Sequence, residues 1–245
     1  EAKLVKEMLI GFKHSGMDLN DENLEKFKAL NKEEAQYVIE YDKNVQEYKD
    51  PLLVTKEQLK GLGEDYIGKL EKTADGKYVV TLDYPDYVPF MLNADDEAAR
   101  KALEYKYNRR GGEQNVKLLE KTLTLRRQIA QLLGYKTHAD LKLENRMAKN
   151  PQTVMAFLKD LQKKLKPMGK TEDKFLIGYK NEQAGKKFRT IYPWESGYWA
   201  NKYRKENLQL DSEKIKEYFP SQVVIDGMLD LFGEVFGITF EPVKI

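Results

Sequence analysis

The chain has 245 residues, of which 41% are hydrophobic and 33% charged, and this composition excludes the disordered, collagen-like and low-complexity classes. Its 42 Lys and Arg nearly balance its 40 Asp and Glu, so neither nucleic acid nor a membrane surface is favoured as a partner. Cysteine is absent, which excludes disulfides, a thiolate nucleophile and Cys-based metal sites.

Neither a signal peptide nor an apolar run long enough to cross a membrane is evident, so we expect a cytoplasmic protein. Apolar residues three and four positions apart predict a mainly α-helical fold with nine or ten helices. Gly16 and Gly134 stand where helix C-caps belong, and Pro151 suits a first helical turn. The main helical segments are expected at residues 4–12, 24–48, 94–107, 116–133, 154–165 and 215–236.

One segment interrupts the helical pattern. Residues 77–83 are β-branched and aromatic, with turn-forming residues on both sides, and predict a strand or small hairpin within residues 77–90. Residues 237–243 are a second extended candidate. We expect residues 1–245 to form one helical unit with no firm internal boundary and an exposed loop at residues 185–193.

Motifs for common reaction chemistries are incomplete. The two histidines, His14 and His138, form no HExxH pair, and a zinc site would need both plus a carboxylate, so we interpret them as unrelated residues at helix ends or surfaces. No serine lies in a Gly-x-Ser-x-Gly elbow, and the loop before Lys170 lacks the first glycine of a phosphate cradle. The 40 carboxylates leave a paired acid–base site open, although a solvated surface is the simpler interpretation.

Several longer segments are distinctive in their order and spacing. They include LRRQIAQLLGYKTHAD at 125–140, RMAKN at 146–150, EYFPSQVV at 217–224 and LFGEVFGITF at 231–240. Together with Pro193-Trp194-Glu195 they resemble the M3 family of zinc metallopeptidases, the group that contains thimet oligopeptidase and neurolysin. The likeness extends over nearly the whole chain.

The resemblance implies hydrolysis of short peptides by a zinc ion held on an HExxH helix plus a distal Glu, at the base of a channel between two mostly helical lobes. In the family that helix lies downstream of the segments matched here. We therefore predict no catalytic, cofactor-binding or metal-binding residue in this chain, and expect the zinc ligands of the full-length enzyme outside it.

The expectation is thus an N-terminal and central helical portion of an M3-like oligopeptidase, which supplies channel-wall helices and is inactive alone. Its expected partners are short peptides and a missing C-terminal catalytic portion, or a second chain that carries it. The alternative is a helical peptide-binding or interaction scaffold without catalytic activity.

The aromatic residues of the matched segments have structural interpretations. Trp194, Tyr198, Trp199 and Tyr203 fall at helical spacing and indicate core packing rather than a peptide-stacking platform. Tyr218 and Phe219 are expected to be buried anchors at a helix end closed by Pro220.

The basic residues have structural interpretations as well. The turn at residues 109–112 is expected to cap and salt-link helices, with binding of peptide termini by Arg109 and Arg110 as the alternative. We interpret one lysine cluster as a solvated surface: Lys163, Lys164, Lys166 and Lys170. In contrast, an exposed apolar face at which a missing portion could dock is expected from Val223, Val224, Met228, Leu231, Phe232 and Phe236.

Overall fold

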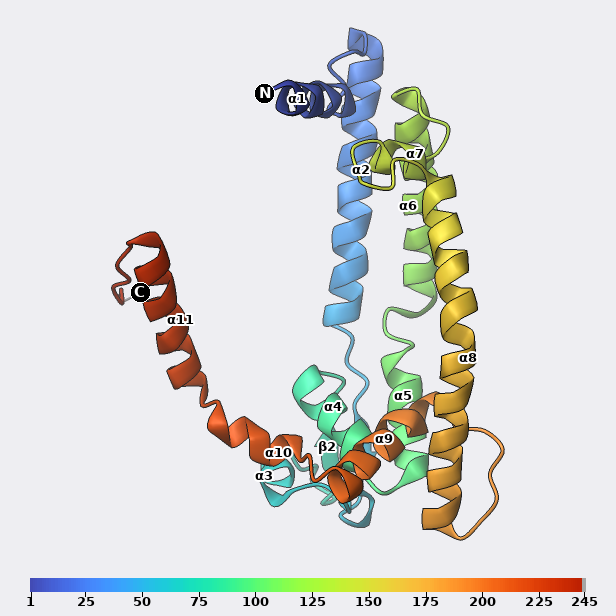
Figure 1. Ribbon diagram of the computed structural model, residues 1–245, viewed down its shortest axis with the longest axis vertical. Helices are drawn as coiled ribbons and strands as arrows, with labels where there is room; N and C mark the ends of the chain where they lie inside the picture. The colour runs from blue at the N-terminus through green and yellow to red at the C-terminus, as the bar shows by residue number, and fades with distance from the viewer. Residues whose placement is uncertain (244–245) are drawn as a thin grey trace.

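A computed structural model describes residues 1–243 of the chain, and its first region is built on two long helices. Helices α2 (Asp21–Gln46) and α6 (Gly112–Leu132) pack against each other and run in opposite directions (Figure 1). Helix α1 (Ala2–His14) and helix α7 (His138–Leu143) lie at the same end of this pair. A small apolar core closes that end, formed by Ile129, Ala130, Leu133 and Leu141.

Polar contacts fix the register of α2 against α6. Asn115 is buried on α6; its side-chain amide donates to the carbonyl of Tyr41 at 3.0 Å and its oxygen accepts from Asn44 at 2.9 Å. Nearer the other end, Arg126 pairs with Glu34 at 2.8 Å. Because a buried amide is costly when unpaired, sliding one helix past the other is disfavoured.

The second region combines a two-stranded sheet with short helices. Strands β1 (Leu52–Val54) and β2 (Tyr78–Val80) pair antiparallel, with Leu52 opposite Val80. The 3₁₀ turn η1 (Glu57–Leu59) and α3 (Glu64–Ile67) connect the strands, and α4 (Tyr84–Asn93) and α5 (Glu97–Tyr107) follow them. The core of this region consists of Val54, Leu59, Leu70, Tyr78, Val80, Leu82, Phe90, Ala94, Ala99 and Leu103.

The predicted strand is confirmed, but its surroundings differ from the expectation. Its partner lies upstream at residues 52–54, and the turn expected at residues 84–87 is the first turn of α4. Pro85 explains the difference, because its fixed φ suits the start of a helix and its missing N–H costs nothing there. The other extended candidate, residues 237–243, forms no strand in the part of the chain that the structure describes.

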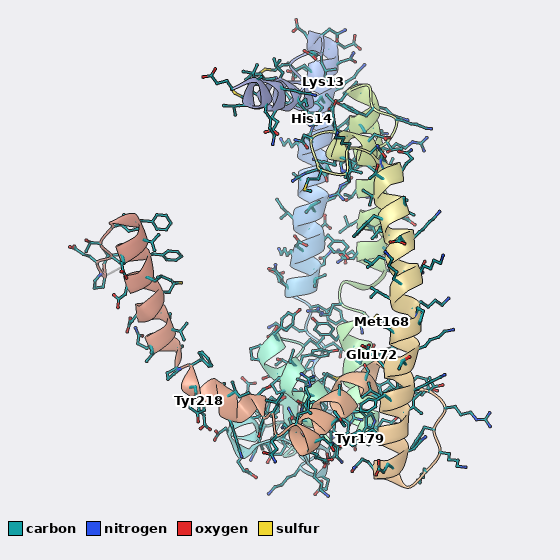
Figure 2. All side chains as sticks on the ribbon, viewed as in Figure 1. Lys13, His14, Met168, Glu172, Tyr179 and Tyr218 are labelled. Atoms are coloured by element: carbon teal, nitrogen blue, oxygen red, sulfur yellow. The ribbon has the colours of Figure 1, made fainter. Side chains whose placement is uncertain are left out.

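Helix α8 (Pro151–Ala184) is far longer than the predicted segment 154–165 and runs through Pro167 and Gly169. An internal proline removes one helical hydrogen bond. The far end of the helix is nevertheless held in place, because Tyr179 and Lys180 are buried where α8 meets α9 (Pro193–Asn207), as Figure 2 shows for Tyr179. Residues 185–192 form the connecting loop, most of it exposed.

The C-terminal elements begin beside the second region, and the last helix then leads away from both regions (Figure 1). They are α10 (Ser212–Ile215), the 3₁₀ turn η2 (Lys216–Tyr218) and α11 (Ser221–Phe236), which has no buried residue. The expected helix end lies before Pro220, but the expected burial is wrong. Tyr218 is 81% exposed and Phe219 64% exposed, because no element within residues 1–243 packs over them. The predicted apolar face of α11 is exposed along its length.

The fold class is confirmed: residues 1–243 contain eleven α-helices, two of them single turns, and one small sheet. The count slightly exceeds the nine or ten expected, because the segment 215–236 is divided at Pro220 and residues 64–67 and 212–215 form single turns. Among the described helices, none combines the length and the apolar character needed to cross a membrane.

The Gly111 backbone provides a test of the α5–α6 junction. Gly111 is the N-cap of α6 with φ of +78°, and a Cβ there would lie 2.2 Å from the side-chain nitrogen of Asn115. Gly111→Ala should lower the free energy of unfolding by more than about 1–2 kcal/mol, which is the cost of holding an alanine at positive φ when nothing clashes with its side chain. The matched control is Gly112→Ala, also at positive φ but with nothing within 4 Å of the added carbon. Equal losses for the two variants in chemical denaturation would contradict the proposed clash.

Candidate functional site

His14 joins three elements at the upper end of the molecule, where Figure 2 labels it. Its Nε2 lies 2.8 Å from a carboxylate oxygen of Glu144 and 3.2 Å from the hydroxyl of Tyr135. The Tyr135 hydroxyl donates to the same carboxylate. This hydrogen bond, followed by that of His14, lowers the pKa of Glu144 below its usual value. The cluster ties the end of α1 to the segments on either side of α7.

The two histidines line one cavity of about 140 Å³, between α1, α2, α6 and α7. Both histidines stand at helix ends as expected, His14 at the end of α1 and His138 at the start of α7, but the expectation that they are unrelated is corrected to the extent that both line this one cavity. Arg126, Glu34 and Lys142 line the same space.

This donor set does not fit a zinc ion. Zinc sites take three or four protein ligands, and within residues 1–243 no group of three or more His, Cys, Asp or Glu side chains is placed to hold a metal. The nearest carboxylates are already committed, Glu34 to Arg126 and Glu144 to His14 and Tyr135.

His138 is the unusual group of this cavity. It is the first residue of α7, and its Nδ1 is buried without a hydrogen-bond partner. Desolvation lowers the pKa of its imidazole below 6.5, and the positive charges of Lys142 and Arg126 add to the effect. The neutral ring is therefore the form that the fold accommodates.

Stability should depend on pH through His138. Because its pKa is lower in the folded chain, the unfolded chain binds more protons below about pH 6.5, so stability is retained above that pH and falls as the pH is lowered. His138→Gln should flatten this dependence between pH 6.5 and 5 in denaturation curves, whereas the control His14→Gln should leave the contribution of His138 in place. An unchanged profile in His138→Gln would contradict the assignment.

The aromatic residues of α9 mostly contribute to packing. Tyr198 is buried, and Tyr203 packs edge-on against Tyr179 and Phe175 of α8 at centroid distances of 5.2 and 4.9 Å. Trp199 packs edge-on against Tyr179 at 6.2 Å, and its indole N–H is buried without a partner. The core interpretation thus describes most of this group.

Trp194 differs from the rest of the aromatic group, because it is only half-buried. It stacks on Tyr192 at 4.6 Å, and the ammonium of Lys101 lies 4.9 Å from its ring. Its exposure follows from its position on the edge of α9 that faces the solvent-exposed side of α5.

A buried guanidinium connects α5 to α9. Arg100 is 1% exposed; it donates to the carbonyls of Ala94 and Trp194, the latter at 3.1 Å, and lies 4.0 Å from the ring of Tyr198. Burial lowers the pKa of Arg100, and nearby negative charges oppose that shift. Burial, together with a 2.8 Å hydrogen bond to Asp95, raises the pKa of Tyr198 to about 12.

A second buried charge, paired with a carboxylate, connects α8 to α9. The side chains of Lys180 and Glu195 are 3% and 0% exposed and form an ion pair. The other Glu195 oxygen accepts from the backbone N–H of Tyr192 at 3.0 Å, which caps the start of α9. The ring of Phe188, from the loop, covers the ammonium at 3.8 Å.

Sequence reasoning missed Arg100, Lys180 and Glu195, because charged residues on helices were interpreted as solvated. One signal was available for Glu195: it stands at the third position of a helix that begins with Pro193, where a carboxylate caps the N-terminus. Nothing in the local sequence marks the other two as buried.

Removing one partner of the pair should be costly. Lys180→Met leaves the Glu195 carboxylate buried and uncompensated, so the free energy of unfolding should fall by about 3–5 kcal/mol. Adding Glu195→Gln to this variant should recover part of the loss, since the remaining charge is gone. Lys164→Met is the matched control: its pair with Asp160 is exposed, and its effect should stay within about 0.5 kcal/mol. A similarly small effect of Lys180→Met in denaturation experiments would show that the buried pair does not hold α8 against α9.

The turn at residues 109–112 caps the helices, but not through ion pairs. Arg110 donates to the carbonyl of Tyr107 at 3.0 Å and covers its ring at 3.8 Å. Arg109 lies over Tyr105 at 4.3 Å. Within the described residues no carboxylate lies in ion-pair range of either arginine, so the expected salt links are wrong and cation–π contacts take their place.

The lysines predicted as a solvated surface are exposed along α8: Lys163, Lys164, Lys166 and Lys170.

The histidine, aromatic and charged clusters together define a helical scaffold in which these side chains join neighbouring elements. They do not converge on a reaction centre within the described residues. The sequence identifies the scaffold: the chain belongs to peptidase family M3, whose sequence model matches residues 90–245.

Curated relatives extend this match over nearly all of the chain. It is 36% identical to saccharolysin of Saccharomyces cerevisiae, over 99% of this chain and 35% of saccharolysin. It is 30% identical to the thimet-like oligopeptidase of Dictyostelium discoideum, over 99% of this chain and 37% of that protein. With oligopeptidase A of Haemophilus influenzae it shares 29% identity, over 97% and 37% of the two sequences. The chain therefore spans about a third of the length of these relatives.

Proposed function

We propose that this chain is the N-terminal and central helical portion of a zinc-dependent metallo-oligopeptidase that hydrolyses short peptides. The observation that carries the proposal is the family membership, combined with alignment of almost the whole chain to about a third of saccharolysin and of two further oligopeptidases. The names of the two further relatives denote oligopeptidases, which are enzymes that act on short peptides.

In this proposal the chain supplies walls of the substrate channel and not the zinc site. Its donor set supports this division, since His14 is engaged by Glu144 and Tyr135 and no third ligand accompanies His138 within the described residues. The zinc ligands of the intact enzyme would lie outside the chain, and zinc would supply Lewis-acid activation there. We propose cytoplasmic peptides as the substrates; cell fractionation tests the location.

The exposed apolar face of α11 supports a further part of the proposal. Six apolar residues of α11 are 42–65% exposed, and they include Val223 near its start and Phe236 at its end. An apolar surface of this kind on one helix is typical of an interface. In the proposal, the catalytic portion of the enzyme packs there.

The alternative is a helical peptide-binding or interaction scaffold that never hydrolyses its ligand. The observation in its favour is the same exposure on α11, together with that of Leu4, Leu9 and Phe12 on α1, because an interaction protein needs such surfaces whether or not it is an enzyme.

Hydrolysis assays separate the two functions. A longer form of the protein that includes an HExxH segment should cleave short internally quenched peptides, lose activity to a chelator and regain it with added zinc. The 245-residue chain alone should not cleave them. The matched control changes the HExxH glutamate to glutamine, which should abolish cleavage while zinc remains bound.

Two outcomes would contradict the peptidase proposal. Peptide binding without cleavage by the longer form would favour the scaffold. Chelator-insensitive cleavage by the present chain would indicate a carboxylate or serine site within it.

A further inference from the structure

A cavity of about 510 Å³ opens along the outer face of α5, away from the histidine cavity and the α8–α9 junction. Its volume is in the range of small-ligand sites, roughly 300–1,000 Å³. Ala98 and Ala102, one helical turn apart on α5, line it together with Tyr48 and Tyr105, and we call the two alanines its floor. The exposed surface of these lining residues is mostly carbon, so the lining is largely apolar.

The charges of this cavity are unbalanced. Lys101, Lys106 and Arg109 line it, against a single carboxylate, Asp50. Asp50 is committed to Lys106 as an ion pair. Within the described residues, Lys101 and Arg109 have no carboxylate in ion-pair range, and each instead lies over an aromatic ring. Two cations that border an apolar floor without counter-charges complement an anionic, partly apolar ligand.

Arg109 and Lys101 differ in how they can bind a carboxylate. Arg109 is exposed just beyond the end of α5, and its guanidinium can hold a carboxylate through two parallel hydrogen bonds. Lys101 lies eight residues earlier, about 12 Å along the helix axis, and Glu97 stands one turn before it. The carboxylate therefore belongs at the Arg109 end, because a guanidinium holds a carboxylate through two bonds whereas the Lys101 ammonium acts as a point charge.

We propose that this cavity binds the carboxylate of a short peptide at Arg109, with the adjacent apolar side chain on the Ala98–Ala102 floor. The peptide continues toward Lys101 and the half-buried ring of Trp194. An extended chain advances about 3.3 Å per residue, so three or four residues cover the distance. The choice of a peptide as ligand rests on the proposed function; the carboxylate and the apolar side chain follow from the cavity itself.

Calorimetric titration of the 245-residue chain tests the site without any hydrolysis. The probes are the tetrapeptide Ala-Ala-Ala-Leu with a free C-terminus, the same peptide amidated, and amidated Ala-Ala-Glu-Leu. The free acid should bind about tenfold or more tightly than the neutral amide, the effect of one charge-assisted contact. The Glu peptide distinguishes a side-chain carboxylate from a terminal one; binding of either carboxylate form above the neutral amide supports the site.

Variants tie the binding to this cavity. Arg109→Ala should reduce affinity for the free acid by about tenfold or more, to the level of the amide. Ala102→Leu, which fills the floor, should weaken both forms. Arg127→Ala is the matched control, because Arg127 is exposed on α6 and lines none of this cavity. Circular dichroism confirms that each variant is folded.

Three results would overturn the proposal: no binding of either carboxylate form, binding of both carboxylate forms no tighter than that of amidated Ala-Ala-Ala-Leu, or equal losses from Arg109→Ala and Arg127→Ala. None of these results bears on hydrolysis by the longer protein. The failure of this site and the failure of the proposed peptidase function are therefore distinguishable.

Discussion

The buried pairing of Lys180 with Glu195 is the contact on which the arrangement of the lower region depends. A charge removed from water is tolerated only with a partner, so α8 and α9 cannot separate or slide without exposing one charge or isolating the other. The same carboxylate caps the start of α9, which makes the beginning of that helix part of the pair. Arg100 extends the constraint to α5, since its guanidinium holds the carbonyl of Trp194. Two consecutive helices, α8 and α9, and the distant helix α5 are thus fixed by two buried cations.

The two apolar cores of the chain are small and separate. One closes the end of the α2–α6 pair, and the other lies between the sheet, α4 and α5. Between them the α2–α6 pair is joined by polar contacts such as that of Asn115. Many apolar side chains outside these cores remain exposed, above all on α1 and α11. The described part of the chain therefore has more apolar surface than its own elements cover.

Local patterns in the sequence predicted a large part of this structure. The periodic helices, the strand at residues 78–80 and the family are all determined by patterns within one segment or by their order along the chain. What could not be predicted depends on contacts between distant segments. Helix α8 continues through Pro167 because α9 holds its far end, and His14 and His138 line one cavity only because α2 pairs with α6. The burial expected for Tyr218 and Phe219 failed for the opposite reason, since no described element covers them.

The length of α8 links the two regions mechanically. Its 34 residues span about 51 Å. It packs against α7 near one end and α9 near the other, and Met168 and Glu172, labelled in its middle in Figure 2, are exposed. In a straight helix of this length, a small rotation at one end produces a large displacement of the other. A tilt of about 10° at the α9 end would carry the α7 end through about 9 Å. Pro167, near the midpoint, is the position where the helix bends most easily, because one of its backbone hydrogen bonds is missing there.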